Sequence, residues 1–223
     1  MFKFIDLGTV EYQKAYQIQK QYFDQNIANK QAGKPTQNTV LFVEHPHVFT
    51  LGKHGQTDNL LADSQTLKQI KATFVTTDRG GDITYHGPGQ LVVYPIIDLD
   101  DFGILTKKYV WALEEIIIRL LKEFAIDARR MEGAPGVWLY GDGRQQPEKI
   151  CAIGVKVSHN ITMHGLALNV NTDLSYFNYI NPCGFKDKGV TSIEKESGHK
   201  VDMEHVKALL QKHFIEVFSQ FSK

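Results

Sequence analysis

The stretch RGGDITYHGPGQ, residues 79–90, decides how the rest of the chain is interpreted. It holds four glycines, one proline and one histidine. Strand-like sequences flank it on both sides, TFVTTD (73–78) before it and QLVVYPIIDL (90–99) after it. A tight hairpin turn needs few flexible positions. We therefore expect something to approach this backbone so closely that side chains are excluded at its glycines.

Composition and charge restrict the class of protein. Lys plus Arg equals Asp plus Glu at 25 each, which argues against a general nucleic-acid-binding protein. The opening MFKFIDLG reaches Asp6 too early for the apolar core of a signal peptide, and no apolar run is long enough to span a bilayer. Two cysteines are too few for a disulfide framework. We expect a cytoplasmic protein with free thiols and no membrane partner.

Hydrophobic periodicity predicts helices near both ends of the chain and strands between them. Thr9 is expected to cap a long helix that runs to about Ala32, and Thr106 to cap a helix over 106–124. A small helix is expected within 61–72 and a last helix from about Asp202. Further strands are predicted in FKFIDLG, TVLFVEH, VFTLG, ARRMEG, GVWLY, EKICAIGVKVS and ITMHGLALNV.

This order of elements favours a mixed α/β domain of the α+β type, with a largely antiparallel sheet and flanking helices, over a doubly wound fold. The chain shows no linker of disordered composition, so residues 1–223 are expected to form one domain.

Two cysteines and one lysine are candidates for chemistry. Cys183 lies in NPCGF (181–185), and it is either a structural, buried residue or a reactive thiol, since a Pro–Gly loop offers it little packing and more exposure. Lys149 opens the strand KICAIGVKV, and it is either a solvated edge residue or an inward-facing group that favours a thiolate. Cys151 lies two residues further on and shares a strand face with Lys149, so it is a rival nucleophile. The apolar strand around Cys151 favours a core role for it instead.

The histidines allow two interpretations. His86 in the glycine-rich stretch and His164 before Gly165 are either hydrogen-bonded core residues or participants in proton transfer. His45, His47 and His54 raise the question of zinc, but no Cys-x-x-Cys or His-Glu-x-x-His spacing accompanies them, and we expect no metal site. GxxxxGK[ST] and GxGxxG loops are absent from the sequence, which weakens a nucleotide-dependent interpretation.

Four motifs in order, RGGDITYHGPGQLVVYPI, KICAIGVKV, HGLALNV and NPCGF, resemble the lipoyl(octanoyl) transferase family. EHPHVFTLGKHG (44–55) fits the region that precedes them, and the resemblance covers about residues 40–194. The resemblance implies a fold like that of biotin and lipoate ligases, with a mixed sheet and helices on one side. Residues 1–223 would then be a single octanoyltransferase catalytic domain.

The resemblance also implies roles for individual residues. Cys183 would accept the acyl group, and Lys149 would lower its pKa and handle protons. The acyl pocket would be lined by Arg79, Gly80, Gly81, Asp82, Ile83, Thr84, Tyr85, His86, Ala152, Ile153, Gly154, Gly165, Leu166 and Ala167, with His164 as an auxiliary candidate. The chain departs from the family at Cys151, where the family usually has alanine.

The implied reaction moves an octanoyl group from acyl carrier protein to a lysine of a lipoyl domain, as the first step of protein lipoylation. The acceptors would be lipoyl domains of 2-oxoacid dehydrogenase E2 subunits and the H protein of glycine cleavage. No cofactor or metal would be needed, because the acyl chain arrives on the carrier's phosphopantetheine. Arg79, Lys53, Lys156, Lys186 and Lys188 are candidates for a basic rim that faces these acidic partners.

Three other classes remain open on the sequence. An ATP-dependent lipoate or biotin ligase would use free acid and survive loss of Cys183. A cysteine acyl hydrolase would release free acid and depend on His86 or His164. A non-catalytic binding protein would form no covalent adduct.

Overall fold

The protein is described by a computed structural model that covers residues 1–141, 143–181 and 188–221. Within these residues the main sheet has eight strands in the order β1-β2-β6-β10-β9-β8-β7, with β11 paired to β9. Its strands are β1 (Lys3–Thr9), β2 (Thr39–Glu44), β6 (Gln90–Ile96), β7 (Arg129–Met131), β8 (Ala134–Leu139), β9 (Glu148–Ser158), β10 (Ile161–Asn169) and β11 (Gly189–Val190). Among the described strand pairs of this main sheet, only β1–β2 and β11–β9 are parallel, so the predicted mixed and largely antiparallel sheet is confirmed.

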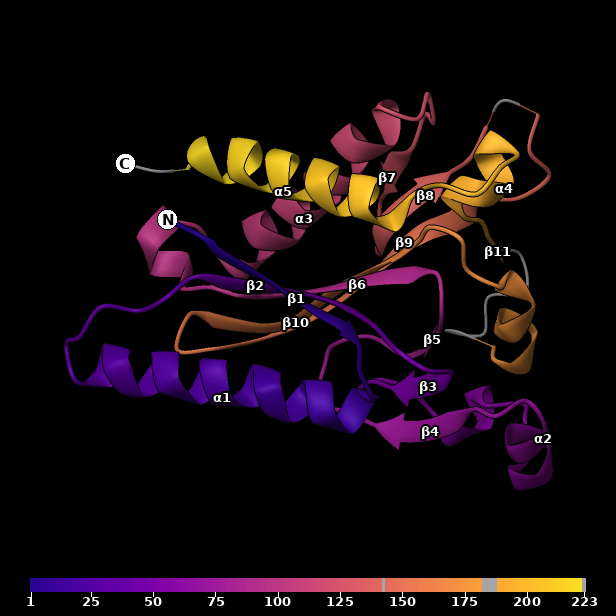
Figure 1. Cartoon of the computed structure of the whole chain (residues 1–223), viewed down its shortest axis with the longest axis horizontal. Helices are drawn as coiled ribbons and strands as arrows, with labels where there is room; N and C mark the ends of the chain where they lie inside the picture. The colour runs from indigo at the N-terminus through magenta and orange to yellow at the C-terminus, as the bar shows by residue number, and fades with distance from the viewer. Residues whose placement is uncertain (142, 182–187, 222–223) are drawn as a thin grey trace.

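Helices cover both faces of this sheet. Helix α1 (Tyr12–Gln31) packs under β2, β6 and β10, whereas α3 (Thr106–Lys122) and α5 (Met203–Ser219) pack on each other above β8 and β9 (Figure 1). The expectation of helices on one side only was therefore wrong. The physical reason is that β6 and β10 are largely apolar and buried at every residue, so both of their faces need cover.

Two hydrophobic cores result from this layering. The larger core lies between the sheet and the α3–α5 pair, around Leu113, Ile117 and Phe214. The smaller core lies between the sheet and α1, around Phe23, Leu41 and Ala167. Successive residues of each central strand therefore face different cores.

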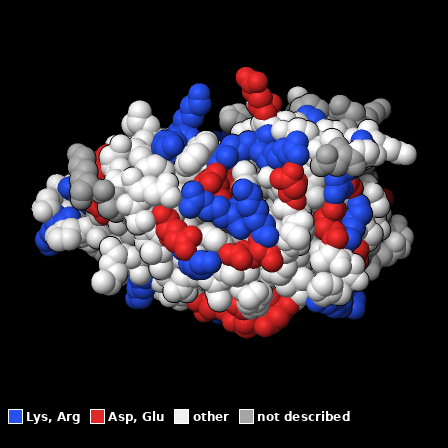
Figure 2. Space-filling view, turned by 90° about the horizontal axis from the view of Figure 1, so that it is seen from above, with Lys and Arg blue, Asp and Glu red and all other residues white. Residues whose placement is uncertain are grey.

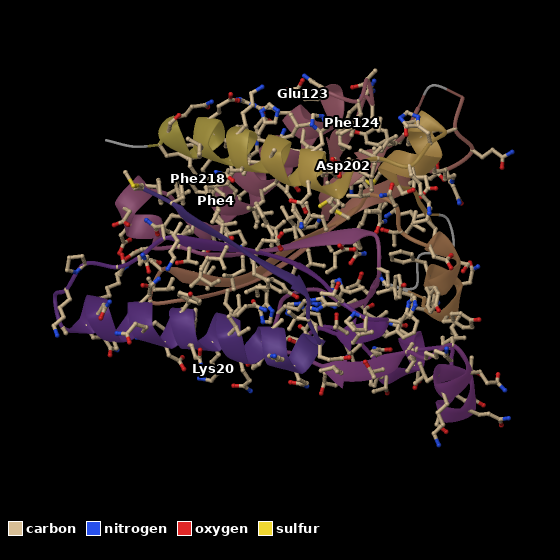
Figure 3. All side chains as sticks on the ribbon, viewed as in Figure 1. Phe4, Lys20, Glu123, Phe124, Asp202 and Phe218 are labelled. Carbon is tan, nitrogen blue, oxygen red and sulfur yellow. The ribbon has the colours of Figure 1, made fainter. Side chains whose placement is uncertain are left out.

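The two ends of the chain meet in the larger core. Phe4 of β1 contacts Phe214 edge to face at 5.9 Å, and Phe2 contacts Phe218 at 5.4 Å. Figure 3 shows Phe4 and Phe218 turned toward the interior between β1 and α5, while Lys20 points away from the sheet on the outer side of α1. This aromatic layer holds β1 against the last helix.

A second sheet of three strands, β4-β3-β5, stands beside the main one within the described residues. It consists of β3 (Val48–Leu51), β4 (Thr73–Thr76) and β5 (Ile83–His86), with the short helix α2 (Ser64–Gln69) and the 3₁₀ segments η1 (Thr57–Asn59) and η3 (Leu174–Tyr179) alongside. Part of the glycine-rich stretch is thus itself a strand, and residues 87–89 lead from the small sheet into β6. The remaining short helices are η2 (Leu99–Phe102) and α4 (Ile193–Ser197).

Two expected helix caps were wrong. Thr9 remains in β1, paired with Glu44, and α1 begins after Glu11, which makes no side-chain capping bond. Leu105 occupies the cap position before Thr106, and the Tyr109 N–H donates to the Leu105 carbonyl. The last helix begins where the sequence predicts, because the Asp202 carboxylate accepts from the Glu204 N–H.

Figure 2 views the face that α3 and α5 cover, where basic and acidic side chains alternate rather than segregate. Ion pairs explain the pattern, for example Lys212 with Glu123 at 3.2 Å and Arg130 with Glu115 at 2.7 Å. Within the described part of the chain, none of the helices combines the length and apolarity that crossing a membrane would require.

Candidate active site

A cavity of about 1040 Å³ lies between the two sheets. Residues from β5, β6, β8, β9, β10 and η3 line it, so nearly every motif of the sequence contributes to one space.

The cavity brings together most of the predicted site residues. Its lining includes Arg79, Gly80, Gly81, Asp82, Ile83, Thr84, His86, Lys149, Ala152, Ile153, Gly154, His164, Gly165, Leu166 and Ala167. Tyr85 is not part of this lining: it is fully buried on the other side of β5, where its ring contacts Phe49 and Phe177. Cys183 lies outside the described residues, as does Lys186.

Lys149 occupies one end of the cavity. Its ammonium lies 4.5 Å from the centre of the Trp138 ring, and the Lys188 ammonium lies 5.6 Å from the same ring. Trp138 is positioned by an indole N–H that donates to the Ala134 carbonyl at 2.9 Å. The aromatic face of Trp138 stabilises the two ammonium cations beside it. These cations in turn favour negative charge on a reacting group at this end of the cavity.

The glycine-rich stretch crosses the sheet at Gly154. The Gly80 N–H donates to the Val155 carbonyl at 3.0 Å, and a Cβ on Gly154 would lie 2.8 Å from the Gly80 carbonyl oxygen. Gly165, on the next strand, would carry its Cβ 2.2 Å from the Val93 carbonyl oxygen. What approaches the glycine-rich backbone is thus, in part, the protein's own sheet.

Arg79 is 8% exposed and stands in the cavity wall rather than at its rim. Its guanidinium donates to the Thr50 carbonyl at 2.6 Å and to the Gly80 carbonyl at 3.0 Å. No carboxylate of the described residues forms an ion pair with it, and burial lowers the pKa of Arg79 from its ordinary value. The expected rim role of Arg79 was therefore wrong, since its cation faces the interior.

A chain of hydrogen bonds that begins at His86 links four strands, β5, β6, β10 and β9. His86 Nδ1 lies 2.7 Å from the Gln90 side-chain oxygen, and the Gln90 amide donates to Asn169 at 2.9 Å. Asn169 donates to the Thr191 carbonyl at 3.0 Å, and the Thr191 N–H donates to the Lys149 carbonyl at 3.0 Å. Burial holds the pKa of His86 well below its ordinary value, so its ring is neutral at pH 7.

His164 forms a second polar group at the cavity wall. Its Nε2 lies 2.8 Å from one oxygen of Asp78, and the Lys156 ammonium lies 2.6 Å from the other. The hydrogen bond with His164, assisted by Lys156, holds the pKa of Asp78 far below its usual range despite burial. Burial lowers the pKa of His164 itself, and Asp78 opposes that shift.

Cys151 is excluded from the cavity lining. The β8–β9 register shifts between Val137 and Trp138, so Ile150 and Cys151 both turn into the larger core while Lys149 faces the cavity. The expected shared face of Lys149 and Cys151 was wrong for this reason. Burial raises the pKa of the Cys151 thiol well above its ordinary value, and the core interpretation of Cys151 is confirmed.

Sequence reasoning missed several residues of the cavity wall, namely Tyr12, Tyr94, Trp138 and Asn169. Tyr12 stacks on the His86 ring at 6.1 Å, and Tyr94 donates to His45 at 2.7 Å. Tyr12 and Tyr94 fit the apolar periodicity of their elements, so only their polar tips distinguish them from core residues. Among the described residues, none of the His, Cys, Asp and Glu groups forms a cluster suited to a metal ion.

The fold is that of lipoate and biotin protein ligase catalytic domains. A bipartite lipoate protein ligase from Thermoplasma acidophilum, solved in a study of an archaeal lipoylation system with its E2 lipoyl domain, superimposes with a TM-score of 0.71. It is 17% identical, and the match covers 97% of this chain and 83% of that one. A biotin protein ligase from Aquifex aeolicus matches with a TM-score of 0.53 at 16% identity, over 99% of this chain and 71% of that one.

Sequence comparison defines the family more narrowly. The lipoyl protein ligase A/B catalytic domain model matches residues 12–215. An octanoyltransferase from Bacteroides fragilis is 52% identical over 210 residues, which are 94% of this chain and 95% of the relative. The chain therefore belongs to the lipoyl protein ligase A/B catalytic domain family, and within it to the octanoyltransferases, which are acyltransferases.

Proposed function

We propose that this protein transfers an octanoyl group from octanoyl-acyl carrier protein to a lysine of lipoyl domains through an acyl thioester on Cys183. One observation carries the proposal: Lys149 stands at the end of a cavity whose floor is built from small and apolar residues of β9 and β10. The acceptors are lipoyl domains of 2-oxoacid dehydrogenase E2 subunits and the glycine cleavage H protein. The lipoylation system in which the related archaeal ligase was studied supports this class of acceptor.

The first half-reaction exchanges one thioester for another. The Cys183 thiolate attacks the octanoyl carbonyl carbon, a carbon–sulfur bond forms, and the bond to the carrier's phosphopantetheine sulfur breaks. Lys149 takes the Cys183 proton before attack and returns it to the departing carrier thiolate. The cation–π contact with Trp138 keeps the lysine charge available to stabilise the Cys183 thiolate.

The second half-reaction converts the thioester into an amide. The acceptor lysine amine attacks the acyl carbon, the bond to Cys183 sulfur breaks, and the amine proton passes through Lys149 to that sulfur. An amide is more stable than a thioester, so the transfer is downhill and requires neither a nucleotide nor a metal.

The cavity wall favours an acyl chain over a polar substrate near Lys149. Ala152 and Ala167 are paired across β9 and β10, and Val92 is paired with Ala167 from β6. Burying each methylene of a chain against such a surface contributes about 0.8 kcal/mol. Eight carbons therefore contribute several kcal/mol of binding, which favours a medium-length chain over acetyl.

Because the fold is shared with lipoate protein ligases, an alternative function is the ATP-dependent activation of free octanoate. Purified protein is therefore incubated with a lipoyl domain and either octanoyl-acyl carrier protein or octanoate plus ATP. The proposal predicts an octanoylated lipoyl domain with the carrier substrate alone. Modification only with octanoate plus ATP would identify a ligase, and free octanoate without modified domain would identify a hydrolase.

Substitution of Lys149 tests its proposed acid–base role in the same transfer assay. We expect Lys149→Ala to lower kcat by about a hundredfold or more, because it removes the proposed acid–base group. Lys212→Ala serves as the control, since Lys212 is exposed, pairs with Glu123 at 3.2 Å and lies outside the cavity lining. Equal activity of the two variants would contradict a catalytic role for Lys149.

A further inference from the structure

Asn169 ends β10 where two strands meet beside Lys149. β10 pairs with β9 as far as Cys151, and β11 then pairs with β9 at Lys149. The side chain of Leu168 packs in the larger core, so that of Asn169 faces the opposite side of the strand, and it lines the cavity. A side-chain amide therefore lies in the cavity wall at the junction of β9, β10 and β11.

Two backbone carbonyls fix the orientation of this amide. Asn169 Nδ2 donates to the Thr191 carbonyl at 3.0 Å, and since a carbonyl only accepts hydrogen bonds, the nitrogen rather than the oxygen faces Thr191. Asn169 Oδ1 accepts from Gln90 Nε2 at 2.9 Å. Gln90 Nε2 also donates to the Tyr85 carbonyl at 3.1 Å, which fixes the Gln90 amide in the same way. The Asn169 side chain is therefore held in one orientation by partners on both sides.

One hydrogen on Asn169 Nδ2 remains unused. The nitrogen carries two hydrogens, and the Thr191 carbonyl accepts one of them. Among the described residues, Nδ2 makes no second hydrogen bond, although Asn169 is only 4% exposed. A buried N–H without an acceptor costs free energy. Because Asn169 lines the cavity, a group bound there can supply the acceptor.

The same contacts place this N–H near Lys149. Thr191, whose carbonyl accepts from Asn169, donates its own N–H to the Lys149 carbonyl at 3.0 Å. Asn169 and Lys149 are thus connected through a single residue, and both line the cavity. The amide donor and the acid–base candidate therefore lie at the same end of the cavity.

Both half-reactions of the proposed transfer create negative charge on the acyl oxygen. Attack of the thiolate on the carbonyl carbon moves the C=O π electrons onto that oxygen, and they return when the bond to the carrier's sulfur breaks. Attack of the acceptor amine creates the same charge before the bond to the enzyme's sulfur breaks. A fixed N–H donor stabilises this oxyanion more than the uncharged carbonyl, and it therefore accelerates both steps.

We propose that Asn169 is a catalytic residue whose second Nδ2 hydrogen is donated to the acyl oxygen while that oxygen carries negative charge. The inference rests on the proposed function, because it takes the acyl carbonyl to lie at the Lys149 end of the cavity. Asn169 and Lys149 then have different roles: the lysine moves protons, whereas the amide stabilises charge on oxygen.

Two asparagines close together in the sequence provide a matched comparison. Asn171 also makes two side-chain hydrogen bonds, since its amide donates to the Val201 carbonyl at 2.8 Å and accepts from the Val201 N–H at 2.9 Å. Asn171 lies outside the cavity lining. We expect Asn169→Ala to lower kcat for octanoyl transfer by about a hundredfold or more, the usual effect of losing one oxyanion donor. Asn171→Ala loses the same number of hydrogen bonds and should retain a kcat close to that of the wild type.

Replacing the acyl oxygen by sulfur separates a catalytic role of Asn169 from a structural one. Wild type and both variants receive octanoyl-acyl carrier protein as the thioester or as the dithioester, in which C=S replaces C=O. Sulfur is a weak hydrogen-bond acceptor, so the dithioester gains little from the donor. The measured quantity is the ratio of kcat/KM for thioester to dithioester, which does not depend on the active fraction of the enzyme. We expect this ratio to be about tenfold lower in Asn169→Ala than in the wild type, and unchanged in Asn171→Ala.

The possible outcomes distinguish this inference from the function on which it rests. A ratio that falls in Asn169→Ala alone supports the oxyanion role. An unchanged ratio in Asn169→Ala, even with slow transfer, or an equal fall in both variants would overturn that role while octanoyl transfer itself stands. Failure of the wild type to transfer octanoyl would overturn the proposed function and this inference with it.

Discussion

Two single histidines in this protein, His45 and His86, are held neutral because burial lowers their pKa. His45 is completely buried, with Nδ1 donating to the Val10 carbonyl at 2.6 Å and Nε2 accepting from Tyr94 at 2.7 Å. Burial lowers the pKa of His45 to about 4. Because both nitrogens already have suitable partners, adding a proton would break the bond from Tyr94.

This arrangement predicts a pH dependence of stability. Between its unfolded pKa of about 6.5 and its folded pKa of about 4, His45 binds a proton in the unfolded chain but not in the folded one. Its contribution is complete above the upper value and is lost as pH falls through this window, by up to about 3 kcal/mol. Urea unfolding of the wild type and of His45→Gln at about pH 7 and about pH 5 measures the effect. The variant should lose less stability on acidification, and an identical loss in both proteins would contradict the role given to His45.

The sequence identifies some of these residues but not their arrangement. The order of the glycine-rich stretch, Lys149 and His164 along the sequence resembles that of a known family, and this resemblance predicted that they line one pocket. The structure places residues of all three in the cavity lining. Tyr12 and Tyr94 were missed because their rings satisfy the apolar pattern of α1 and β6. Tyr85 was included with its neighbours, but its ring packs against Phe49, Tyr176 and Phe177 and does not line the cavity.

At the scale of elements, α3 connects the outer helical layer to the strand beside Lys149. Its Glu114 faces inward, accepts from the Gly136 N–H at 3.1 Å and pairs with Arg130 at 3.1 Å. A Cβ on Gly136 would lie 3.5 Å from Lys149 Cε, so this helix fixes the backbone next to the catalytic candidate.

Two adjacent glutamates of α3 provide a controlled test of that connection. Glu114→Ala leaves the buried Gly136 N–H without its acceptor and should cost about 1–3 kcal/mol of unfolding free energy. Glu115→Ala removes the pairs with Arg119 and Arg130 nearer the surface and should cost at most about 1 kcal/mol. Denaturant unfolding of both variants provides the comparison. A larger loss of unfolding free energy in Glu115→Ala than in Glu114→Ala would contradict the proposed role of Glu114 in connecting α3 to β8.

Element types were largely predictable, whereas pairings were not. A long apolar run such as residues 90–99 predicts a central strand by composition alone. The short strand β5 was hidden by its glycine-rich flanks, and its partner β3 lies more than thirty residues earlier. Whether helices cover one or both faces depends on which strands are central, and that order is set by long-range pairing.

At the scale of the whole molecule, the ends of the chain close the larger core. Phe214 of α5 contacts Phe2 and Phe4 of β1 edge to face and stacks on Phe218 at 4.7 Å. The last helix is therefore part of the structure that supports the sheet, although it contributes no residue to the cavity lining.

Neighbouring residues on α5 test this closure. Phe214→Ala should cost about 3–5 kcal/mol, because it removes a fully buried ring from the aromatic layer. Ile215→Ala, at a side chain with 47% exposure, should change stability by about 0.5 kcal/mol. Thermal or urea unfolding distinguishes the two, and similar losses would show that the terminal layer contributes little.

The most direct test concerns the covalent step. Wild-type protein is mixed with octanoyl-acyl carrier protein without a lipoyl domain, and its intact mass and peptides are analysed under conditions that preserve thioesters. The proposed mechanism predicts one octanoyl group on Cys183, retained in Cys151→Ala and abolished in Cys183→Ala. An adduct on Cys151, or full transfer by Cys183→Ala, would contradict it.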